Sequence, residues 1–281
     1  MSRLRLEPAA TAEAIRALGL EFPGPVGLGA GFDRYASHIA EVRGWGFGFV
    51  ELGTVTPQPV AGHNPGAAEL AANLSRRRKH RGSPVLGVNL GIQPGTPLEA
   101  ACQDYVHGMN VLWRAADYLV LNFTSQHARP LRDPRLRPIL LTLLATVMDA
   151  HRELARQHGR AVPLLVKWPV GPNMQDAVAV AGRLRGFGYA GVVAAFEPQA
   201  PGFIHWEAWV PAACRALVAA MGPACSLIAV GGVDCAERAR ALCEAGAALV
   251  ELYGAFVQQG PALVRALARA WADAGRLLHP A

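Results

Sequence analysis

The sequence predicts an α/β fold, a (β/α)8 TIM barrel that residues 1–281 form as one domain. Three observations predict it: eight short apolar runs recur along the chain, longer helix-like stretches alternate with them, and no linker rich in Gly, Ser or Pro divides the chain. Continuous apolar runs without polar alternation are typical of parallel strands that are buried on both faces, and their alternation with helices indicates βαβ units. Eight runs fit a closed barrel better than an open doubly wound sheet, which stays the alternative fold.

The apolar runs give the strands in chain order, and the stretches between them give the helices. The predicted strands are residues 26–30, 49–53, 85–89, 118–122, 164–167, 191–195, 227–231 and 249–253. The predicted helices are residues 36–43, 98–115, 138–158, 176–187, 206–221, 236–245 and 261–274. Several helical stretches place apolar residues at i, i+3, i+4 and i+7, which predicts one buried face for each.

Length and composition indicate one large globular domain. The 281 residues slightly exceed the roughly 250 residues of a typical barrel of this kind. Hydrophobic residues make up 52% and charged residues 17%, which excludes a disordered chain. The net charge of +6 favours anionic ligands, but it comes from scattered Arg residues without a zinc-finger, RNA-binding or helix-turn-helix pattern. We therefore expect a small-molecule substrate and no nucleic-acid partner.

Cysteine usage and the N-terminal sequence predict a cytoplasmic protein. The cysteines form an odd set without any C-x-x-C pair, which is typical of reduced, buried thiols. They are Cys102, Cys214, Cys225, Cys235 and Cys243. The first residues lack the continuous apolar segment of a signal peptide. The most apolar helical stretch, residues 139–148, is about half the length needed to cross a bilayer, so we expect no integral membrane segment.

Lys167 is the first candidate for chemistry, because it ends an apolar run at the mouth of the predicted barrel. A buried ammonium is costly unless it meets an anion or acts as an amine. Lys167 could stabilise negative charge on a bound ring, form a Schiff base with a carbonyl, or belong to a structural ion pair. Asn89 and Asn122 end adjacent strands, and their amides predict either contacts to a flat heterocycle or packing against neighbouring backbone.

Glycine pairs follow the last two predicted strands. Gly231 and Gly232 come after the seventh strand, and Tyr253 and Gly254 come at the end of the eighth. Barrels commonly bind a phosphate at this position through exposed backbone N–H groups. The basic run 76–81 is interpreted either as a solvated surface patch or as a rim that attracts anions.

Several motifs at these positions resemble the dihydroorotate dehydrogenase family, in particular its class with a serine base. The most specific is residues 49–59, FVELGTVTPQP, which closely follow the family's FVEVGTVTPRP. Other matching segments are residues 27–33 with GLAAGLD, 87–91 with GINIG, 117–125 with DYLxxNxSS, 166–167 with the flavin lysine, and 230–233 and 252–253 with the phosphate loops. The similarity runs from about residue 20 to residue 270, which is nearly the whole chain.

The resemblance implies an FMN flavoprotein, an oxidoreductase of the CH–CH type that serves pyrimidine biosynthesis. The implied flavin contacts are Ala30, Gly31, Thr54, Asn89, Asn122 and Lys167, and the implied phosphate contacts are Gly231, Gly232, Tyr253 and Gly254. Ser125 would remove a proton while hydride passes to the flavin, and His127 would help to carry that proton away. Lys167 would stand where a reduced flavin carries negative charge. A homodimer is compatible with this prediction.

The segments expected to contact the substrate depart from the family's pattern. Arg34 stands in place of the substrate lysine, and His127 stands in place of the asparagine after the catalytic serine. Phe196 and Glu197 begin the segment that replaces the family's NTT, and Gly254 replaces a hydroxyl residue. The NRMGFNN loop has no equivalent. We therefore interpret Arg34, His127, Phe196 and Glu197 as residues of an altered substrate-binding surface.

Four functions fit these residues. The first is an FMN-dependent oxidoreductase for a dihydroorotate-like or other small unsaturated or cyclic substrate, and the second is a dihydroorotate dehydrogenase with an altered loop. The third is a lyase or isomerase that uses Lys167 as an amine. The fourth is a flavin-free, catalytically inactive binding or partner protein. We find no counterpart of the helical extension that lets serine-base members dock on membranes and admit quinone, so the electron acceptor stays open.

Overall fold

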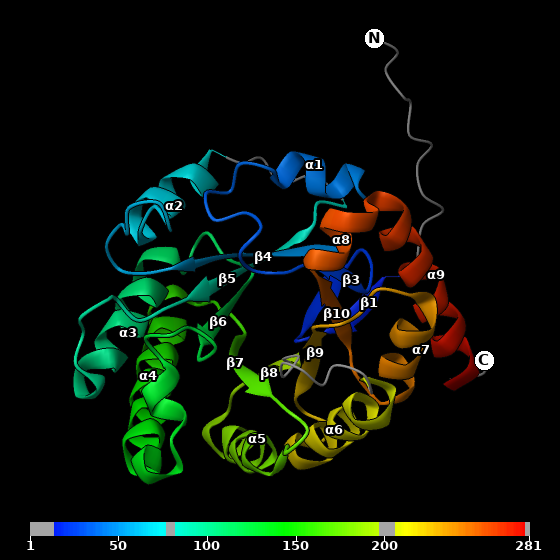
Figure 1. The fold of residues 1–281 in the computed structure, drawn as a ribbon. Coiled ribbons are helices and arrows are strands. Elements are labelled where there is room, and N and C mark those ends of the chain that lie inside the picture. The colour runs from blue at the N-terminus through cyan, green and yellow to red at the C-terminus, as the bar shows by residue number, and fades with distance from the viewer. Residues whose placement is uncertain (1–13, 77–81, 197–205, 279–281) are drawn as a thin grey trace.

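The computed structural model describes residues 14–76, 82–196 and 206–278 and confirms the predicted barrel (Figure 1). Eight parallel strands close on themselves in the order β10, β3, β4, β5, β6, β7, β8, β9. Their bounds are β3 Val26–Leu28, β4 Phe49–Val55, β5 Val85–Leu90, β6 Tyr118–Asn122, β7 Leu164–Val170, β8 Gly191–Phe196, β9 Ser226–Val230 and β10 Leu249–Leu252. Each predicted apolar run overlaps one barrel strand, and closure of the sheet excludes the open alternative.

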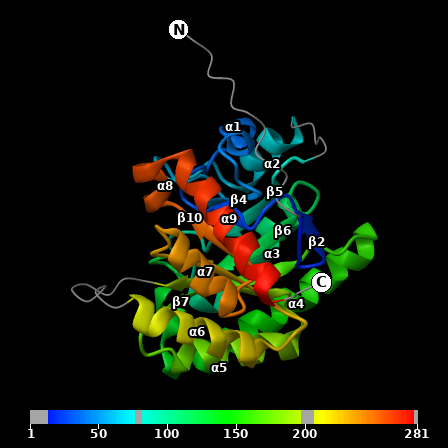
Figure 2. The ribbon, with the colours of Figure 1, turned by 90° about the vertical axis from the view of Figure 1, so that its right-hand side faces the viewer.

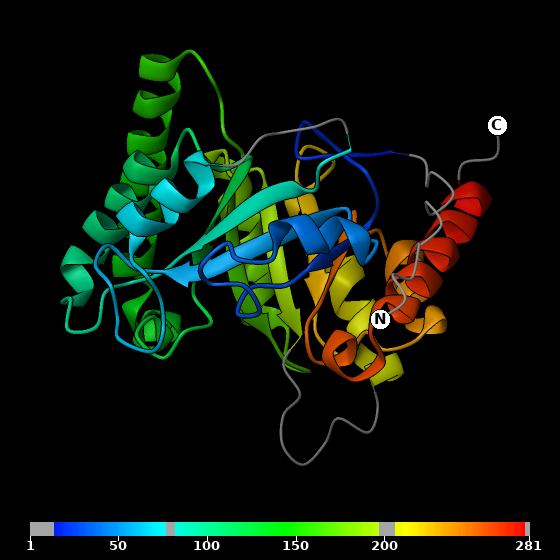
Figure 3. The ribbon, with the colours of Figure 1, turned by 90° about the horizontal axis from the view of Figure 1, so that it is seen from above.

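Helices cover the outside of the barrel, and Figure 3 shows α4 and α9 on opposite sides of it. The described α-helices are α1 Ile39–Gly44, α2 Ala67–Ser75, α3 Ala101–Leu112, α4 Arg137–His158, α5 Gln175–Phe187, α6 Trp206–Met221, α7 Ala236–Glu244, α8 Gly254–Gln259 and α9 Pro261–Leu278. Short 3-10 turns are η1 Leu98–Ala100, η2 Arg129–Arg132 and η3 Pro134–Leu136. Within the described ranges, no helix combines the length and the apolar character that crossing a membrane requires. All five cysteines are free thiols.

The sequence prediction missed two helices, α2 and α8. The α2 segment was not among the predicted helices, yet it buries Ala67, Leu70 and Leu74 at the i, i+3, i+7 spacing of an amphipathic helix. The α8 helix has only six residues and directly follows Tyr253. A helix of fewer than two turns is too short to show a period in its sequence.

A hairpin that was not predicted closes the amino-terminal end of the barrel. Strands β1 Ile15–Ala17 and β2 Leu20–Phe22 pair antiparallel to form it. The ring of Phe22 is fully buried, and its centroid lies 5.4 Å from that of Phe49. Figure 2 shows β2 at one end of the barrel. Strands of three residues are too short for an alternating pattern to appear, which explains the omission.

Two glycines make room for the aromatic rings of this lowest layer. A Cβ added at Gly27 would lie 2.2 Å from the ring of Phe49, and one added at Gly87 would lie 2.1 Å from the ring of Tyr118. Both glycines stand on strands that neighbour the ring-bearing strands. The barrel is therefore filled by large rings where the adjacent strand carries no side chain.

The next layer toward the mouth is polar. Side chains of a strand alternate between its two faces, so residues two positions further along share the inward direction. Phe49, Leu165 and Leu249 all belong to the lowest apolar layer. Two residues after each of them stand Glu51, Lys167 and Glu251, all buried. Strand alternation thus places three ionisable groups in one layer of the interior.

We expect Phe22→Ala to lower the free energy of unfolding by about 3–5 kcal/mol, because it removes a fully buried ring from the floor of the barrel. Leu277→Ala is the control, since Leu277 is 78% exposed and its truncation removes little packing. Denaturant unfolding followed by circular dichroism measures both changes. Equal stability of the two variants would show that the hairpin contributes nothing to the core.

Candidate active site

Lys167 is held by two carboxyl groups in the interior of the barrel. Its Nζ donates to Glu51 Oε1 at 2.6 Å and to Glu251 Oε2 at 3.2 Å. Both glutamate side chains are fully buried, and the lysine side chain is nearly so. A buried charge is tolerated when it is paired and hydrogen-bonded. The structural ion pair, one of the three interpretations of Lys167, is therefore present in the structure.

The proton balance of this cluster follows from its burial. Burial by itself lowers the pKa of Lys167, but Glu251 and Glu51 outweigh that effect and raise the pKa above its ordinary value. Burial raises the pKa of Glu251 well above its ordinary value, and the neighbouring Glu51 raises it further, while Lys167 opposes both. Burial and the neighbouring Glu51 therefore favour the protonated form of Glu251, while the two glutamates favour the charged form of Lys167.

A chain of side-chain hydrogen bonds runs from this cluster to the mouth. Asn89 Nδ2 donates to Glu51 Oε1 at 2.9 Å, and Thr54 Oγ1 donates to Asn89 Oδ1 at 2.8 Å. Asn122 Nδ2 donates to Thr54 Oγ1 at 2.8 Å. The oxygen of Asn122 in turn accepts from the backbone N–H and the hydroxyl of Thr124. The structure thus joins strands β4, β5 and β6 through three predicted site residues and connects them to Lys167.

The backbone after β3 lies beside the end of β4. Gly31 N–H donates to the carbonyl of Gly53 at 2.7 Å, and Gly53 N–H donates to the carbonyl of Asp33 at 3.3 Å. This pairing brings Ala30 and Gly31 next to Thr54, as expected of a shared binding surface. Arg34 is half-buried, and its guanidinium donates to the carbonyl of His63 at 3.2 Å, so it reaches across to the loop that follows β4.

Asp33 organises this loop, a role that the sequence analysis did not identify. Its buried carboxylate accepts from the backbone N–H groups of Tyr35, Ser37 and His38 at 3.2, 2.9 and 2.8 Å. A short acidic side chain that accepts backbone N–H groups a few residues further along is a common turn device. Asp33 therefore fixes the path of the chain on either side of Arg34.

Ser125 and His127 lie in the loop after β6, and both are half-buried. The hydroxyl of Ser125 accepts from the backbone N–H of Ala128 at 3.3 Å. The ring Nε2 of His127 lies 3.3 Å from Nε2 of Gln126, so the imidazole is paired with that amide rather than with the serine. The predicted pair of base and helper is close in sequence but is not hydrogen-bonded in the structure.

The predicted phosphate segment has the backbone conformation that such binding needs. Gly231 and Gly232 adopt φ values of +113° and +71°, which favour glycine. Trp206 Nε1 donates to the carbonyl of Gly231 at 3.2 Å, and Arg238 Nη1 donates to the carbonyl of Gly232 at 2.8 Å. Because a trans peptide directs its N–H opposite to its carbonyl, the N–H groups that follow these carbonyls point away from Trp206 and Arg238.

Open space lies in front of the second glycine segment. A Cβ added at Gly254 would meet no heavy atom of the described residues within 4 Å. Tyr253 is 48% exposed, and its ring centroid lies 6.2 Å from that of Phe32 in the loop after β3. The room at Gly254 suits an oxyanion that approaches the backbone closely.

The structure does not bring Phe196 to the mouth. Its side chain is buried in the layer between the strands and the helices, with its ring centroid 5.9 Å from that of Trp209 on α6. Val193, three residues earlier, faces the barrel interior, so alternation turns Phe196 outward. Glu197 lies outside the described residues, and so does most of the basic run, of which only Arg76 is described, exposed at the end of α2.

Glu51 and Glu251 are the functional-site residues that sequence reasoning missed. Each is the single charged residue of a run that is otherwise apolar, Phe49–Val55 and Leu249–Leu252. A lone carboxyl group in such a run indicates a buried ion pair, since a charge inside a buried strand is tolerated only when it is paired. Because side chains alternate between the two faces of a strand, both residues would then have been placed on the inward face, which also carries Lys167.

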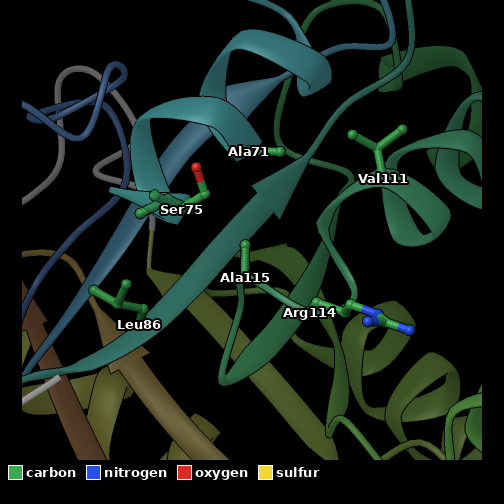
Figure 4. A pocket seen from close by; sticks show the side chains of 7 residues that line it. Ala71, Ser75, Leu86, Val111, Arg114 and Ala115 are labelled. Carbon is green, nitrogen blue, oxygen red and sulfur yellow. The ribbon is translucent and has the colours of Figure 1, made fainter. Parts of the chain in front are cut away.

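A cavity of about 390 Å³ lies elsewhere, outside the barrel (Figure 4). Its lining comes from α2, β5, α3 and the turn after α3, and consists of Ala71, Leu74, Ser75, Leu86, Val111, Arg114 and Ala115. None of these residues belongs to the hydrogen-bonded chain at the mouth. The cavity is therefore separate from the candidate active site.

Fold and site together define a barrel protein whose ligand binds at the carboxyl ends of the strands. Residues 14–194 match the family model described as dihydroorotate dehydrogenase. The chain belongs to the dihydroorotate dehydrogenase family, whose members are FMN-dependent oxidoreductases of the CH–CH type. This membership confirms the resemblance seen in the motifs.

Relatives of similar length support this assignment. A protein of Chromobacterium violaceum named dihydroorotate dehydrogenase (quinone) is 36% identical, over 96% of this chain and 90% of that relative. A protein of Flavobacterium lutescens with the same name is 35% identical, over 89% of this chain and 81% of that relative. The crystal structure of DHODH from Eimeria tenella in complex with ferulenol matches with a TM-score of 0.80 at 25% identity, over 97% of this chain and 87% of that one.

The residues at the mouth fit an FMN group. The amides of Asn89 and Asn122 each spend one N–H on a neighbouring side chain, and an amide carries two. Lys167 likewise gives two N–H groups to the glutamates and carries a third. Donors for a ring edge are therefore available on β5, β6 and β7, while the glycine segments follow β9 and β10.

We expect Lys167→Met to lower the free energy of unfolding at pH 7 by about 3–5 kcal/mol, because it leaves buried carboxyl groups without their cation. The loss should shrink as the pH falls toward 4, since protonation of both carboxyl groups removes the uncompensated charge. Arg276→Met is the control, since the Arg276–Asp273 pair is exposed and exposed pairs contribute little. A loss in Lys167→Met that does not change with pH would contradict the buried ion pair as its cause.

Proposed function

We propose that this chain acts like a dihydroorotate dehydrogenase and oxidises dihydroorotate or a closely similar small cyclic substrate. In this reaction a proton leaves one carbon of the substrate and a hydride leaves its neighbour, which forms a C=C bond. Bound FMN supplies the hydride acceptor. The observation that carries the proposal is the hydrogen-bonded chain from Lys167 through Glu51, Asn89 and Thr54 to Asn122, which presents donors at the mouth.

The cofactor would be held by two groups of residues from neighbouring parts of the mouth, since β10 pairs with β3. The proposed ring contacts are Ala30, Gly31, Thr54, Asn89, Asn122 and Lys167, and the proposed phosphate contacts are Gly231, Gly232, Tyr253 and Gly254. The ring contacts come from the ends of β3 to β7, whereas the phosphate contacts follow β9 and β10. Preorganised donors aimed at the place where charge develops are the strongest electrostatic aid that a protein gives to a reaction.

Ser125 is the proposed base, and its Oγ would accept the substrate proton. A hydroxyl is a poor base unless its own proton can leave and the negative charge on its oxygen is stabilised. The N–H of Ala128, which donates to this oxygen, favours the charged form. His127 would accept the hydroxyl proton after its ring turns from Gln126 toward Ser125.

Arg34 is the proposed contact for an anionic group of the substrate. The residue is half-buried, with its guanidinium beside the loop after β4, and arginine suits planar, bidentate recognition of a carboxylate. The relatives described above are named for quinone, which makes a quinone our proposed electron acceptor. Five free thiols agree with a cytoplasmic location, which we propose as well.

The geometry disfavours a Schiff-base enzyme. An amine attacks a carbonyl only in its neutral form. The two glutamates raise the pKa of Lys167 and occupy its ammonium, so the neutral amine is scarce. Lys167 is better suited to act as a fixed positive charge.

We expect Ser125→Ala to slow the reduction of bound FMN by dihydroorotate at least about 100-fold, because it removes the base while the flavin contacts stay in place. Anaerobic stopped-flow measurement of the loss of flavin absorbance gives the rate. Ser75→Ala, a change on the exposed end of α2, is the control. An unchanged rate in Ser125→Ala would remove Ser125 from the reaction, and no reduction by dihydroorotate in the unaltered protein would refute the proposed substrate.

We expect Gly254→Asp to weaken FMN binding at least about tenfold, which corresponds to about 1.4 kcal/mol, because a carboxylate would fill the space proposed for the phosphate. Titration of FMN into the FMN-free protein, followed by the change in FMN fluorescence, measures the affinity. Gly186→Asp on α5 is the matched control, since an added Cβ there also meets no heavy atom of the described residues within 4 Å. Equal affinities of the two variants would place the phosphate elsewhere.

A further inference from the structure

The buried cluster beneath the proposed flavin site carries more acid than its cation can balance. Two ionised glutamates and one ammonium would leave a net charge of −1 in a layer that is almost fully buried. Glu51 Oε2 and Glu251 Oε1 are buried and have no hydrogen-bond partner among the described residues. One proton shared by the carboxyl pair would make the layer neutral. A like-charged pair of this kind cannot easily ionise twice.

Groups on four other strands face or flank Glu251. Glu51 on β4 and Lys167 on β7 face it directly. Tyr118 on β6 lies near both glutamates; burial first, and then the charges of Glu51 and Glu251, raise the pKa of its hydroxyl, so Tyr118 stays neutral. The neighbouring β-strand residue Val230 is apolar, and Gly29 beside the carboxyl offers no side chain.

We propose that Glu251 carries the proton that sets the charge of this cluster, so that loss of the proton makes the bound flavin harder to reduce. The inference rests on the proposed function, since it requires FMN above the cluster. It assigns a role to a residue that touches Lys167 rather than the substrate. Glu251 thereby positions the Lys167 ammonium and also adjusts its effect.

The physical cause is electrostatic. Hydride transfer adds negative charge to the flavin, and the ammonium of Lys167 favours it. When Glu251 loses its proton to solvent, the cluster changes from neutral to a net charge of −1, and this charge opposes the added one. Charges in the interior are weakly screened, so the effect persists at high salt. No electron moves within the cluster, and the proton is exchanged with water alone.

The reduction potential of bound FMN, measured as a function of pH, tests the inference. Glu251→Gln keeps the shape and a carbonyl acceptor for Lys167 but cannot ionise. As the pH rises above the pKa of Glu251, the reduction equilibrium of the unaltered protein should weaken by up to tenfold more per pH unit than that of Glu251→Gln, or about 30 mV for two electrons. Glu69→Gln on the exposed face of α2 is the control and should follow the unaltered protein. Identical pH slopes in all three proteins would overturn the inference.

Infrared spectroscopy of the FMN-free protein tests the proton itself, whatever the flavin does. The unaltered protein and Glu69→Gln should show the C=O band of a protonated carboxyl group at neutral pH, which disappears as the pH rises. Glu251→Gln should lack this band. Its presence in Glu251→Gln, or its absence from the unaltered protein, would refute the assignment. A protein that shows the band but binds no FMN would instead refute the proposed function. If Glu251→Gln fails to fold, the pH titration of the C=O band in the unaltered protein alone decides whether the cluster holds this proton.

Discussion

The pairing of one ammonium with two carboxyl groups in the barrel interior is the interaction on which the site depends. Lys167, Glu51 and Glu251 come from three different strands, β7, β4 and β10. Each group alone would be too costly to bury. Together they link three strands that are not neighbours in the barrel. Glu51 also accepts a hydrogen bond from Asn89, which connects the cluster to the mouth. Core and active site are therefore one continuous structure.

The order of layers explains why the ligand can be bound so near the core. Apolar side chains fill the lowest layer, the ionisable cluster fills the next, and amides and a hydroxyl from Asn89, Asn122 and Thr54 form the mouth. Asn89 joins the amide layer to the ionisable layer beneath it by donating to Glu51, and the second N–H of each amide stays available to a ligand.

The fold was predictable because each barrel strand is a continuous apolar run, and the mouth residues were predictable because each ends such a run. Lys167, Asn89 and Asn122 were found in this way. Glu51 and Glu251 were not, since they stand within runs and their partners belong to strands far away in the sequence. Contacts of that kind are set by closure of the barrel, which no local pattern records.

The remaining differences have equally local causes. Phe196 was expected at the mouth because it begins the segment that replaces the family's NTT. Inward and outward residues of a strand differ by a single position, and its ring packs against α6. The β1–β2 hairpin is too short to produce a period. The relation of Ser125 to His127 depends on loop torsions, and these leave no periodic trace in a sequence.

The hairpin that closes one end of the barrel affects how water and protons reach the ionisable layer. Because Phe22 and Tyr118 are fully buried at the floor, water can approach the ionisable layer of the described structure only from the opposite end. A ligand bound over that opening then restricts the access of water to the ionisable layer. With that ligand bound, protons pass between the layer and bulk water more slowly, so the layer takes longer to reach equilibrium after a change of pH.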